Sequence, residues 1–427
     1  MPGMKINSML LNQCKQTSLI RLFFFSLITF LYLFNIKFLA ASWMPTGRLV
    51  FLGMLVFYGV SSSVFLKKEI ARYPLYFILL LFVLLYVVVQ SFLIQQTDFS
   101  LISKMIVFCV FSLFMAAMSR NFFPSIQLFL QSIALACLLQ AIMVYISFFS
   151  PEYRNWLSLI LVESSNIPLT NGSRVPGFSN SSGSALSLIL SLGVFSLMSL
   201  YYCTSKPFQR FTFLFGSIFI LLSCIFVGKL GLFLSIYFII SILILESIRR
   251  PIFAFKILII GTITLFFLMK YTFVGDLGQF TYVMERSFAL FMGNEDSTLT
   301  ALKSMPIPAL DVNTMIGYGI TTDAKGINAA HSDVGYIQTY YALGFIFSLI
   351  FYTSLFFYLL VKAIAVKDRP YRLLSFVLFI PLFIIELKEP FITKLGYSFV
   401  IFSFLFIVNK TSKYSFRSSN AHLLRQR

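Results

Sequence analysis

Residues 211 to 245 read FTFLFGSIFILLSCIFVGKLGLFLSIYFIISILIL, and this stretch decides the fold. Its single charged residue is Lys229, within the interruption Val227-Gly-Lys-Leu-Gly231. The run could form one long membrane crossing or two short ones broken at this interruption, and two crossings keep more of the chain's basic residues on the inner side. Backbone polar groups in hydrocarbon must be satisfied within the segment, so both crossings are expected to be helical. The sequence therefore predicts two transmembrane helices with Lys229 between them at one membrane surface.

The rest of the chain repeats this apolar pattern. Of its 427 residues, 59% are hydrophobic and only 11% are charged, and the mean hydropathy is +0.89. These values lie far outside the composition of a soluble domain. We predict an all-α polytopic integral membrane protein in which residues 1–427 form a single membrane domain with about 12 transmembrane helices. The predicted spans lie near residues 22–41, 49–66, 74–94, 101–118, 126–149, 184–203, 211–227, 230–246, 252–269, 335–361, 372–387 and 394–409.

The placement of Lys and Arg predicts the orientation, because basic residues near span ends are retained in the cytoplasm. With the N-terminus inside, about two thirds of the 33 basic residues fall in inner segments. We therefore expect both termini to be cytoplasmic, with a cytoplasmic tail at residues 410–427. Two large outer loops follow, at residues 150–183 and 270–334. Apolar stretches between residues 282 and 292 predict a short surface helix in the second loop.

Several classes of partner and cofactor are disfavoured. The formal charge of +18 does not indicate nucleic-acid binding, since the basic residues form short clusters at span ends rather than one face. Such clusters suit anionic membrane lipids. The five cysteines have no paired spacing, and the predicted outer loops contain none, so neither a zinc site nor a disulfide framework is expected. His331 and His422 lie on opposite predicted membrane faces. We therefore expect no metal and no other cofactor.

Four short motifs lie at the outer ends of predicted spans. They are Arg174-Val-Pro-Gly-Phe-Ser-Asn180 with Gly183 opening a span, Gly228-Lys-Leu-Gly231, Gly317-Tyr-Gly319, and His331-Ser-Asp-Val-Gly-Tyr336. In order, spacing and side of the membrane, this set resembles the Wzy-type repeat-unit polymerases of bacterial surface polysaccharides, within the O-antigen polymerase and ligase superfamily. The resemblance covers nearly the whole chain, and its motifs are short and diffuse.

The resemblance implies a glycosyltransferase on the outer face of the bacterial inner membrane. Such an enzyme moves the growing glycan from undecaprenyl pyrophosphate onto the non-reducing end of a new undecaprenyl-pyrophosphate-linked repeat unit. A flippase and a chain-length regulator of the same pathway are the implied protein partners. The resemblance also implies that Arg174, Lys229 and Lys303 bind the carrier pyrophosphate. The chain departs from the family at the last two, which are more often Arg, and lysine keeps the charge without the bidentate fork.

His331 is the candidate catalytic residue. A sugar hydroxyl that attacks an anomeric carbon needs a base near its oxygen, and neutral histidine titrates in a suitable range. Asp333 is a candidate to orient the imidazole or to hold a sugar hydroxyl. His331 is alternatively an ordinary interfacial residue, and Arg174 a snorkelling anchor or an ion-pair partner. Three glycines are expected to be structural, namely Gly177 in a turn, Gly183 at a helix start, and Gly335.

Two other functions remain open. An O-antigen ligase would have a similar bundle and a similar outer histidine, but it would pass the glycan to lipid A core. A lipid-linked oligosaccharide flippase or another transporter would suit twelve spans. A transporter site is expected near the bilayer midplane between broken helices, whereas the informative residues here lie outside the spans. Acidic and basic residues at Glu386, Lys388 and Glu389 predict ion pairs at the outer end of the eleventh span, or the lining of a substrate path.

Overall fold

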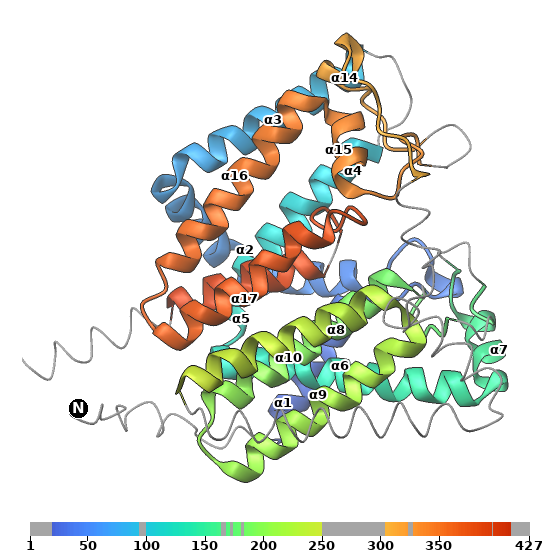
Figure 1. Ribbon diagram of the computed structural model, residues 1–427, viewed down its shortest axis with the longest axis vertical. Helices are drawn as coiled ribbons and strands as arrows, with labels where there is room; N and C mark the ends of the chain where they lie inside the picture. The colour runs from blue at the N-terminus through green and yellow to red at the C-terminus, as the bar shows by residue number, and fades with distance from the viewer. Residues whose placement is uncertain are drawn as a thin grey trace, which may run out of the picture.

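The computed structural model describes residues 19–93, 100–163, 168–170, 174–180, 183–249, 304–322, 328–394 and 396–410. Apart from connections and two isolated β-bridges, these residues are helical (Figure 1). Within these described ranges, eight helices are long and apolar enough to cross a membrane, so the chain is a polytopic all-helical membrane protein. They are α2 (Thr46–Arg72), α3 (Pro74–Leu93), the continuous α4 (Ser100–Ile106), η2 (Val107–Phe114) and α5 (Met115–Phe122), α6 (Ile126–Phe149), α8 (Ser184–Cys203), α9 (Pro207–Val227), α10 (Lys229–Arg249) and α16 (Phe345–Ile364).

In the part of the chain that the structure describes, three shorter helices also belong to the bundle. They are α1 (Leu19–Phe34), α17 (Arg369–Ile385) and the helix Tyr397–Lys410. Each overlaps a predicted span, whereas the ninth predicted span and the surface helix predicted between residues 282 and 292 lie outside the described residues. The number of twelve spans therefore stays a prediction. Helix α1 stops at Phe34, earlier than expected, because Asn35 takes a left-handed φ of +43°.

The stretch from residue 211 to 245 forms two helices, as predicted. Helix α9 ends at Val227 and α10 begins at Lys229, with Gly228 extended between them. The chain reverses direction between the two helices, which pack against each other, and both contact α8. Lys229 is therefore the first residue of a helix, at one end of the bundle.

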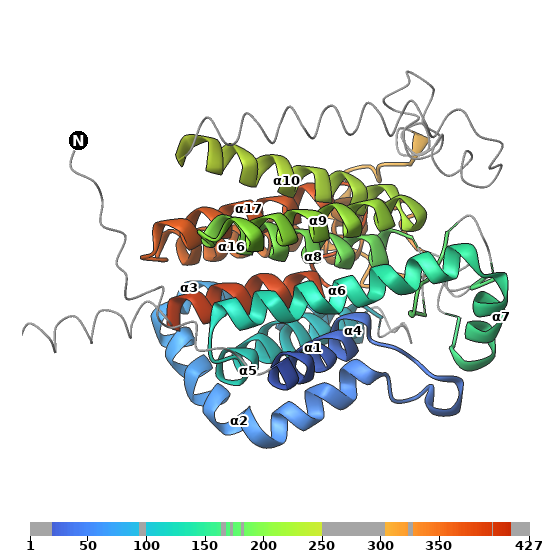
Figure 2. The same ribbon diagram turned by 90° about the horizontal axis from the view of Figure 1, so that it is seen from below.

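The most deeply enclosed span is α8. In its most apolar window, 89% of the residues are buried inside the protein, compared with 17% in α2. Figure 2 shows α8 between α6 on one side and α10 on the other, and contacts with α9 complete the enclosure. Small residues allow these close approaches. A Cβ atom on Gly193 of α8 would lie 2.3 Å from Cys137 Cβ of α6, and one on Gly231 would lie 2.1 Å from the carbonyl oxygen of Ser187.

The predicted tenth span is broken rather than continuous. Helix α15 (Gly335–Leu343) and α16 are separated by Gly344, whose φ is +81°. A Cβ atom on Gly344 would lie 2.4 Å from the carbonyl carbon of Ile316, so this position accepts only glycine. The motif Gly317-Tyr-Gly319 lies against the break and supplies donors to its carbonyl groups. Its Tyr318 and Gly319 N–H groups donate to the carbonyls of Tyr341 and Ala342, both at 2.9 Å.

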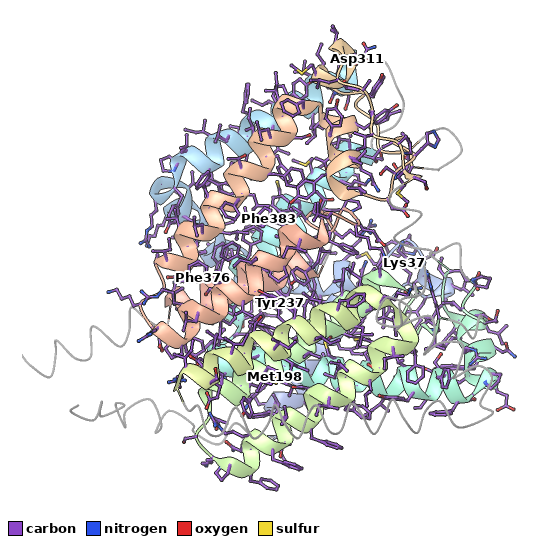
Figure 3. All side chains as sticks on the ribbon, in the orientation of Figure 1. Lys37, Met198, Tyr237, Asp311, Phe376 and Phe383 are labelled. Carbon is purple, nitrogen blue, oxygen red and sulfur yellow. The ribbon has the colours of Figure 1, made fainter. Side chains whose placement is uncertain are left out.

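A short helix, α14 (Val312–Ile316), carries this motif and is fixed by its own cap. Asp311 Oδ1 accepts from Thr314 N (2.7 Å), while Thr314 Oγ1 accepts from Asp311 N (2.8 Å). Hydrogen bonds from the Thr314 N–H group and then from the Thr314 hydroxyl to its carboxylate hold the pKa of Asp311 below its usual value. Figure 3 places Asp311 at the tip of the molecule. Gln90 of α3 donates to the carbonyls of Ile316 and Ala342, which joins the break to a neighbouring span.

The loop predicted at residues 150–183 contains a helix that the sequence did not indicate. Helix α7 (Pro151–Ile160) begins directly after α6, with Ser150 Oγ accepting from Tyr153 N (3.1 Å) at its N-cap. It lies at the same end of the bundle as α14 and α15, on the right of Figure 1. We call this the His331 end, because the His331 motif also lies there.

We expect Gly231→Ala to destabilise the bundle, because the added methyl group would overlap the backbone of Ser187. The cost of such overpacking is about 1–3 kcal/mol. A lower midpoint of thermal unfolding of the purified protein in detergent would show it. Gly53→Ala is the matched control, since a Cβ atom there meets nothing within 4 Å and alanine favours a helix. Equal midpoints for the two variants would contradict the close α8–α10 contact.

Candidate functional site

The Arg174–Asn180 segment is held against the bundle by backbone hydrogen bonds. Val175 N donates to the carbonyl of Phe226 near the end of α9 (3.2 Å). From α6, Gln140 Nε2 donates to the carbonyl of Pro176 (3.1 Å), and its Oε1 accepts from Phe178 N (3.3 Å). Most of the segment is buried, whereas Arg174 is half-buried at its edge. Two spans thus determine where the arginine lies.

Gly177 makes this approach possible. Its φ is +61°, in the left-handed region, and a Cβ atom there would lie 2.5 Å from Gln140 Nε2. A side chain would therefore be strained by the backbone and would also displace the amide that holds the segment. Gly177 lies at a bend of the chain where a larger residue does not fit.

Asn180 joins the far end of this segment to two others. Its Nδ2 donates to the carbonyls of Lys37 (2.6 Å) and Val162 (2.8 Å), and its Oδ1 accepts from Lys37 N (2.5 Å). Lys37 was expected within the first span, but it lies in the connection after α1, at the position labelled in Figure 3. A single buried amide therefore organises three connections at the His331 end.

The N-termini of α8 and α10 meet beside Arg174. Gly183 is the N-cap residue of α8, with φ at +93°, and a Cβ atom on it would be 3.5 Å from Arg174 Nη1. A Cβ atom on Gly228 would in turn be 3.0 Å from the carbonyl carbon of Gly183. Lys229, the next residue, opens α10. Arg174 and Lys229 thus flank two adjacent helix N-termini, where the helix dipoles also favour an anion.

His331 is exposed in the turn before α15, between the buried residues Ala330 and Ser332. His331 has a left-handed φ of +49°, and its N–H donates to the carbonyl of Asn328 (3.0 Å). The Asn328 side chain accepts from Ala330 N (3.1 Å) and donates to the carbonyl of Ser332. Gln338 Nε2 donates to the same carbonyl at 3.0 Å. Two amide side chains, neither singled out from the sequence, therefore support the turn.

Asp333 is also exposed, and its N–H contacts the sulfur of Met305 at 3.2 Å. Over the described ranges, no hydrogen bond or ion pair joins its carboxylate to the His331 imidazole. An orienting role for Asp333 stays a prediction. Lys303, the third predicted pyrophosphate ligand, lies outside the described residues.

Helix α15 begins on a platform formed by residues 386–394, the connection that follows α17. A Cβ atom on Gly335 would lie 2.8 Å from the backbone of Glu389 and Pro390, so the start of α15 rests directly on this chain. Tyr336 N donates to the carbonyl of Glu386 (3.3 Å). The turn that contains His331 ends at this contact. The platform therefore determines where the turn lies.

Glu386 holds the platform together from within. Its buried carboxylate accepts from Phe391 N (2.8 Å) and Ile392 N (3.2 Å), and from Tyr352 Oη of α16 (2.9 Å). The sequence had indicated ion pairs here. Instead, two backbone N–H groups and a hydroxyl satisfy Glu386, while Glu389 pairs with Lys394 at 3.2 Å.

One hydrogen bond connects the two parts of the site. Ser184 Oγ, in the first turn of α8, donates to Glu389 Oε1 at 2.5 Å. Glu389 thus contacts Gly335 through its backbone and α8 through its side chain. The helix start beside Arg174 and Lys229 is therefore linked by a short chain of contacts to the helix start that follows His331.

Sequence reasoning had identified Arg174, Gly183, Lys229, His331 and Gly335, but not the groups that hold them. Gln140 gave a usable signal, since it is an amide within an apolar span, where polar side chains usually have a specific partner. Asn328 and Ser184 had no such sequence signal, because polar residues are common in and near loops. In the part of the chain that the structure describes, no three His, Cys, Asp or Glu side chains are grouped to hold a metal ion.

No protein-family model matches the chain, and no curated protein matches its sequence. The site is therefore interpreted from its own geometry.

We expect Glu386→Gln to loosen the platform, because the amide offers one acceptor oxygen where the carboxylate offers two. An unpaired buried donor costs about 1–3 kcal/mol, which would speed local opening by roughly tenfold or more. Hydrogen exchange read by mass spectrometry should be faster in peptides covering residues 331–343 and 387–394. Glu152→Gln makes the same change at an exposed position of α7 and should leave both peptides unchanged. Unaltered exchange in Glu386→Gln would rule out the platform role.

Proposed function

We propose that the chain is a metal-independent polysaccharide polymerase of the bacterial inner membrane. It would transfer a growing O-antigen or related glycan from undecaprenyl pyrophosphate to the non-reducing end of a new lipid-linked repeat unit. One observation carries this proposal. The Arg174 guanidinium lies beside the N-terminus of α8, Lys229 is the first residue of the adjacent α10, and Ser184 and Glu389 connect this place to the segment bearing His331.

The paired N-termini suit a pyrophosphate leaving group. As the bond from the anomeric carbon to the pyrophosphate oxygen breaks, negative charge accumulates on that oxygen. Cations and helix dipoles already aimed at this charge stabilise the transition state without reorganisation. Arg174 can donate two parallel hydrogen bonds to phosphate oxygens, whereas Lys229 supplies a compact charge. Lys303 belongs to the same proposal as a further cation of the second loop.

His331 would act as the general base. The hydroxyl oxygen of the incoming repeat unit forms a bond to the anomeric carbon, and its proton passes to the imidazole. Undecaprenyl pyrophosphate leaves with the electron pair of the broken bond. Because His331 and Asp333 are exposed, an oligosaccharide acceptor could reach them, and Asp333 would hold a neighbouring sugar hydroxyl.

In this proposal the His331 end faces the outer side of the membrane and both termini are cytoplasmic. Basic residues support that orientation, because four helices carry one in their last turn at the opposite end. They are Arg72 of α2, Arg120 of α5, Arg249 of α10 and Lys362 of α16. Cytoplasmic span ends are enriched in such residues. Membrane lipids would surround the protein. A flippase and a chain-length regulator would be its partners in the same pathway.

A flippase or another transporter is the second candidate, and the helix break at Gly344 favours it. Transporters bind substrates where broken helices expose backbone groups. Here Tyr318, Gly319 and Gln90 already donate to the carbonyls that the break frees. The break is thus satisfied by the protein itself, and the polymerase remains the better proposal. An O-antigen ligase would use the same site with a different acceptor.

We expect Arg174→Ala to abolish long polymer in cells while single repeat units still reach the surface acceptor. Arg174→Lys should keep part of the activity, because a point charge still attracts a phosphate after the fork is lost. Gel separation of the surface glycan by length gives the readout. Lys206→Ala removes an exposed charge at the opposite end and should change nothing. Wild-type chain lengths in Arg174→Ala, at equal protein level, would remove the pyrophosphate role.

We expect His331→Ala to lower the rate of polymerisation by roughly 10²- to 10⁴-fold, the usual contribution of a general base. His331→Gln should be nearly as slow, since an amide can hold the hydroxyl but cannot take its proton. The assay is ladder formation by purified protein from a lipid-linked repeat unit in the presence of EDTA. A wild-type rate in His331→Ala would exclude the base. Wild-type protein that carries the substrate across liposomes without lengthening it would be a flippase.

A further inference from the structure

Both tryptophans of the chain lie at the His331 end and are exposed. Trp43 follows the short helix η1 (Leu39–Ala41), and Trp156 lies on α7. Their side chains are 74% and 49% exposed, respectively. Leu39 and Leu159 beside them are also exposed. An apolar surface of this kind at the end of a membrane bundle requires a partner.

The two elements form one structure, which we call the tryptophan ledge, comprising residues 38–43 and α7. An antiparallel bridge pairs Phe38 with Leu161, and Val162 N donates to the carbonyl of Lys37 at 3.0 Å. Arg154 fixes α7 to the end of α6. Its buried guanidinium donates to the carbonyls of Ser147 (2.6 Å) and Phe148 (3.2 Å). The ledge is therefore tied to the spans.

The ledge continues the exposed apolar surfaces of two spans. On α6, the exposed residues Ile142, Ile146 and Phe149 lead directly to α7 and Trp156. On α2, the exposed residues Leu49, Leu52 and Val56 lead back to Trp43. Exposed stripes on membrane-spanning helices face acyl chains, so the ledge lies where these two lipid-facing surfaces end.

We propose that the tryptophan ledge is a membrane-interface anchor whose partner is the boundary between lipid headgroups and acyl chains at the His331 end. Indole rings favour this boundary, because the ring is apolar while its N–H group hydrogen-bonds to headgroups or water. A short helix with an apolar face lies in the plane of the boundary. Arg48, which donates to the carbonyl of Trp43 at 3.3 Å, adds a cation for lipid phosphates.

The anchor has a consequence for the Arg174–Asn180 segment. Asn180 bonds to the carbonyls of Lys37 and Val162, which adjoin the two halves of the ledge. The ledge would therefore set the depth of this segment relative to the bilayer. This inference does not depend on the reaction that the protein performs.

Because the chain contains two tryptophans, replacing one leaves the other as the single fluorophore. The full-length variants Trp43→Phe and Trp156→Phe each keep one fluorophore. They are placed in nanodiscs of phosphatidylcholine brominated near the headgroup, at mid-chain or at the chain end. Each remaining tryptophan should be quenched most by bromine near the headgroup and least by bromine at the chain end. Phe57→Trp in a chain lacking both native tryptophans is the depth control. Phe57 is 81% exposed near the middle of α2, and the order of quenching should be reversed there.

Quenching by aqueous acrylamide without quenching by any brominated lipid would overturn the proposal, because the ledge would then face water. Absence of quenching by either agent would also overturn it, since the indoles would be covered by protein. Strongest quenching by bromine at the chain end would place the ledge within the hydrocarbon core and likewise contradict an interfacial anchor. The conservative Phe replacements keep an aromatic ring at each site, and size-exclusion chromatography checks that both variants stay folded.

Discussion

The site depends on the contact between the first turns of α8 and α10, where backbone meets backbone. Gly228 and Gly231 allow α10 to approach so closely that Ser187 Oγ accepts a hydrogen bond from Gly231 N at 3.2 Å. In a bilayer, helices gain little by hiding apolar surface from lipid, and close packing at small residues is a principal source of association. The same glycines bring Lys229 beside the Arg174 segment. Stability and the arrangement of charge therefore have one physical origin.

The other part of the site is joined to this contact by polar groups. Glu386 holds the platform together, and Glu389 accepts a hydrogen bond from Ser184. Gly335 allows α15 to lie directly on the backbone of the platform at Glu389. Buried carboxylates are costly unless they are hydrogen-bonded, and Glu386 has three partners for its oxygens. The nine residues of this connection, 386–394, thus contact both the start of α15 and the first turn of α8.

The helices could be predicted from the sequence because hydrocarbon leaves a backbone few alternatives. The separation of α9 and α10 was also predictable, since Lys229 and two glycines interrupt the apolar run. The break at Gly344 was not, because it depends on Gly317, which is close in space but distant in sequence. The early end of α1 did have a local signal, namely an asparagine able to adopt a left-handed conformation. Motif order singled out Arg174, Lys229 and His331, but the Ser184–Glu389 bond that connects them has no sequence signature.

The enclosure of α8 also bears on how the protein is made. Among the eight candidate spans, α8 has the lowest mean hydropathy and the largest buried share. Ser187, Ser191 and Ser196 of α8 donate to carbonyls of their own helix, which reduces the cost of their hydroxyls without making the helix strongly apolar. A nascent chain would therefore gain less from releasing α8 into lipid than from releasing α6 or α9. Among these eight described spans, α8 is therefore the one that lipid alone would retain least well, and we expect its insertion to rely on neighbours made before and after it.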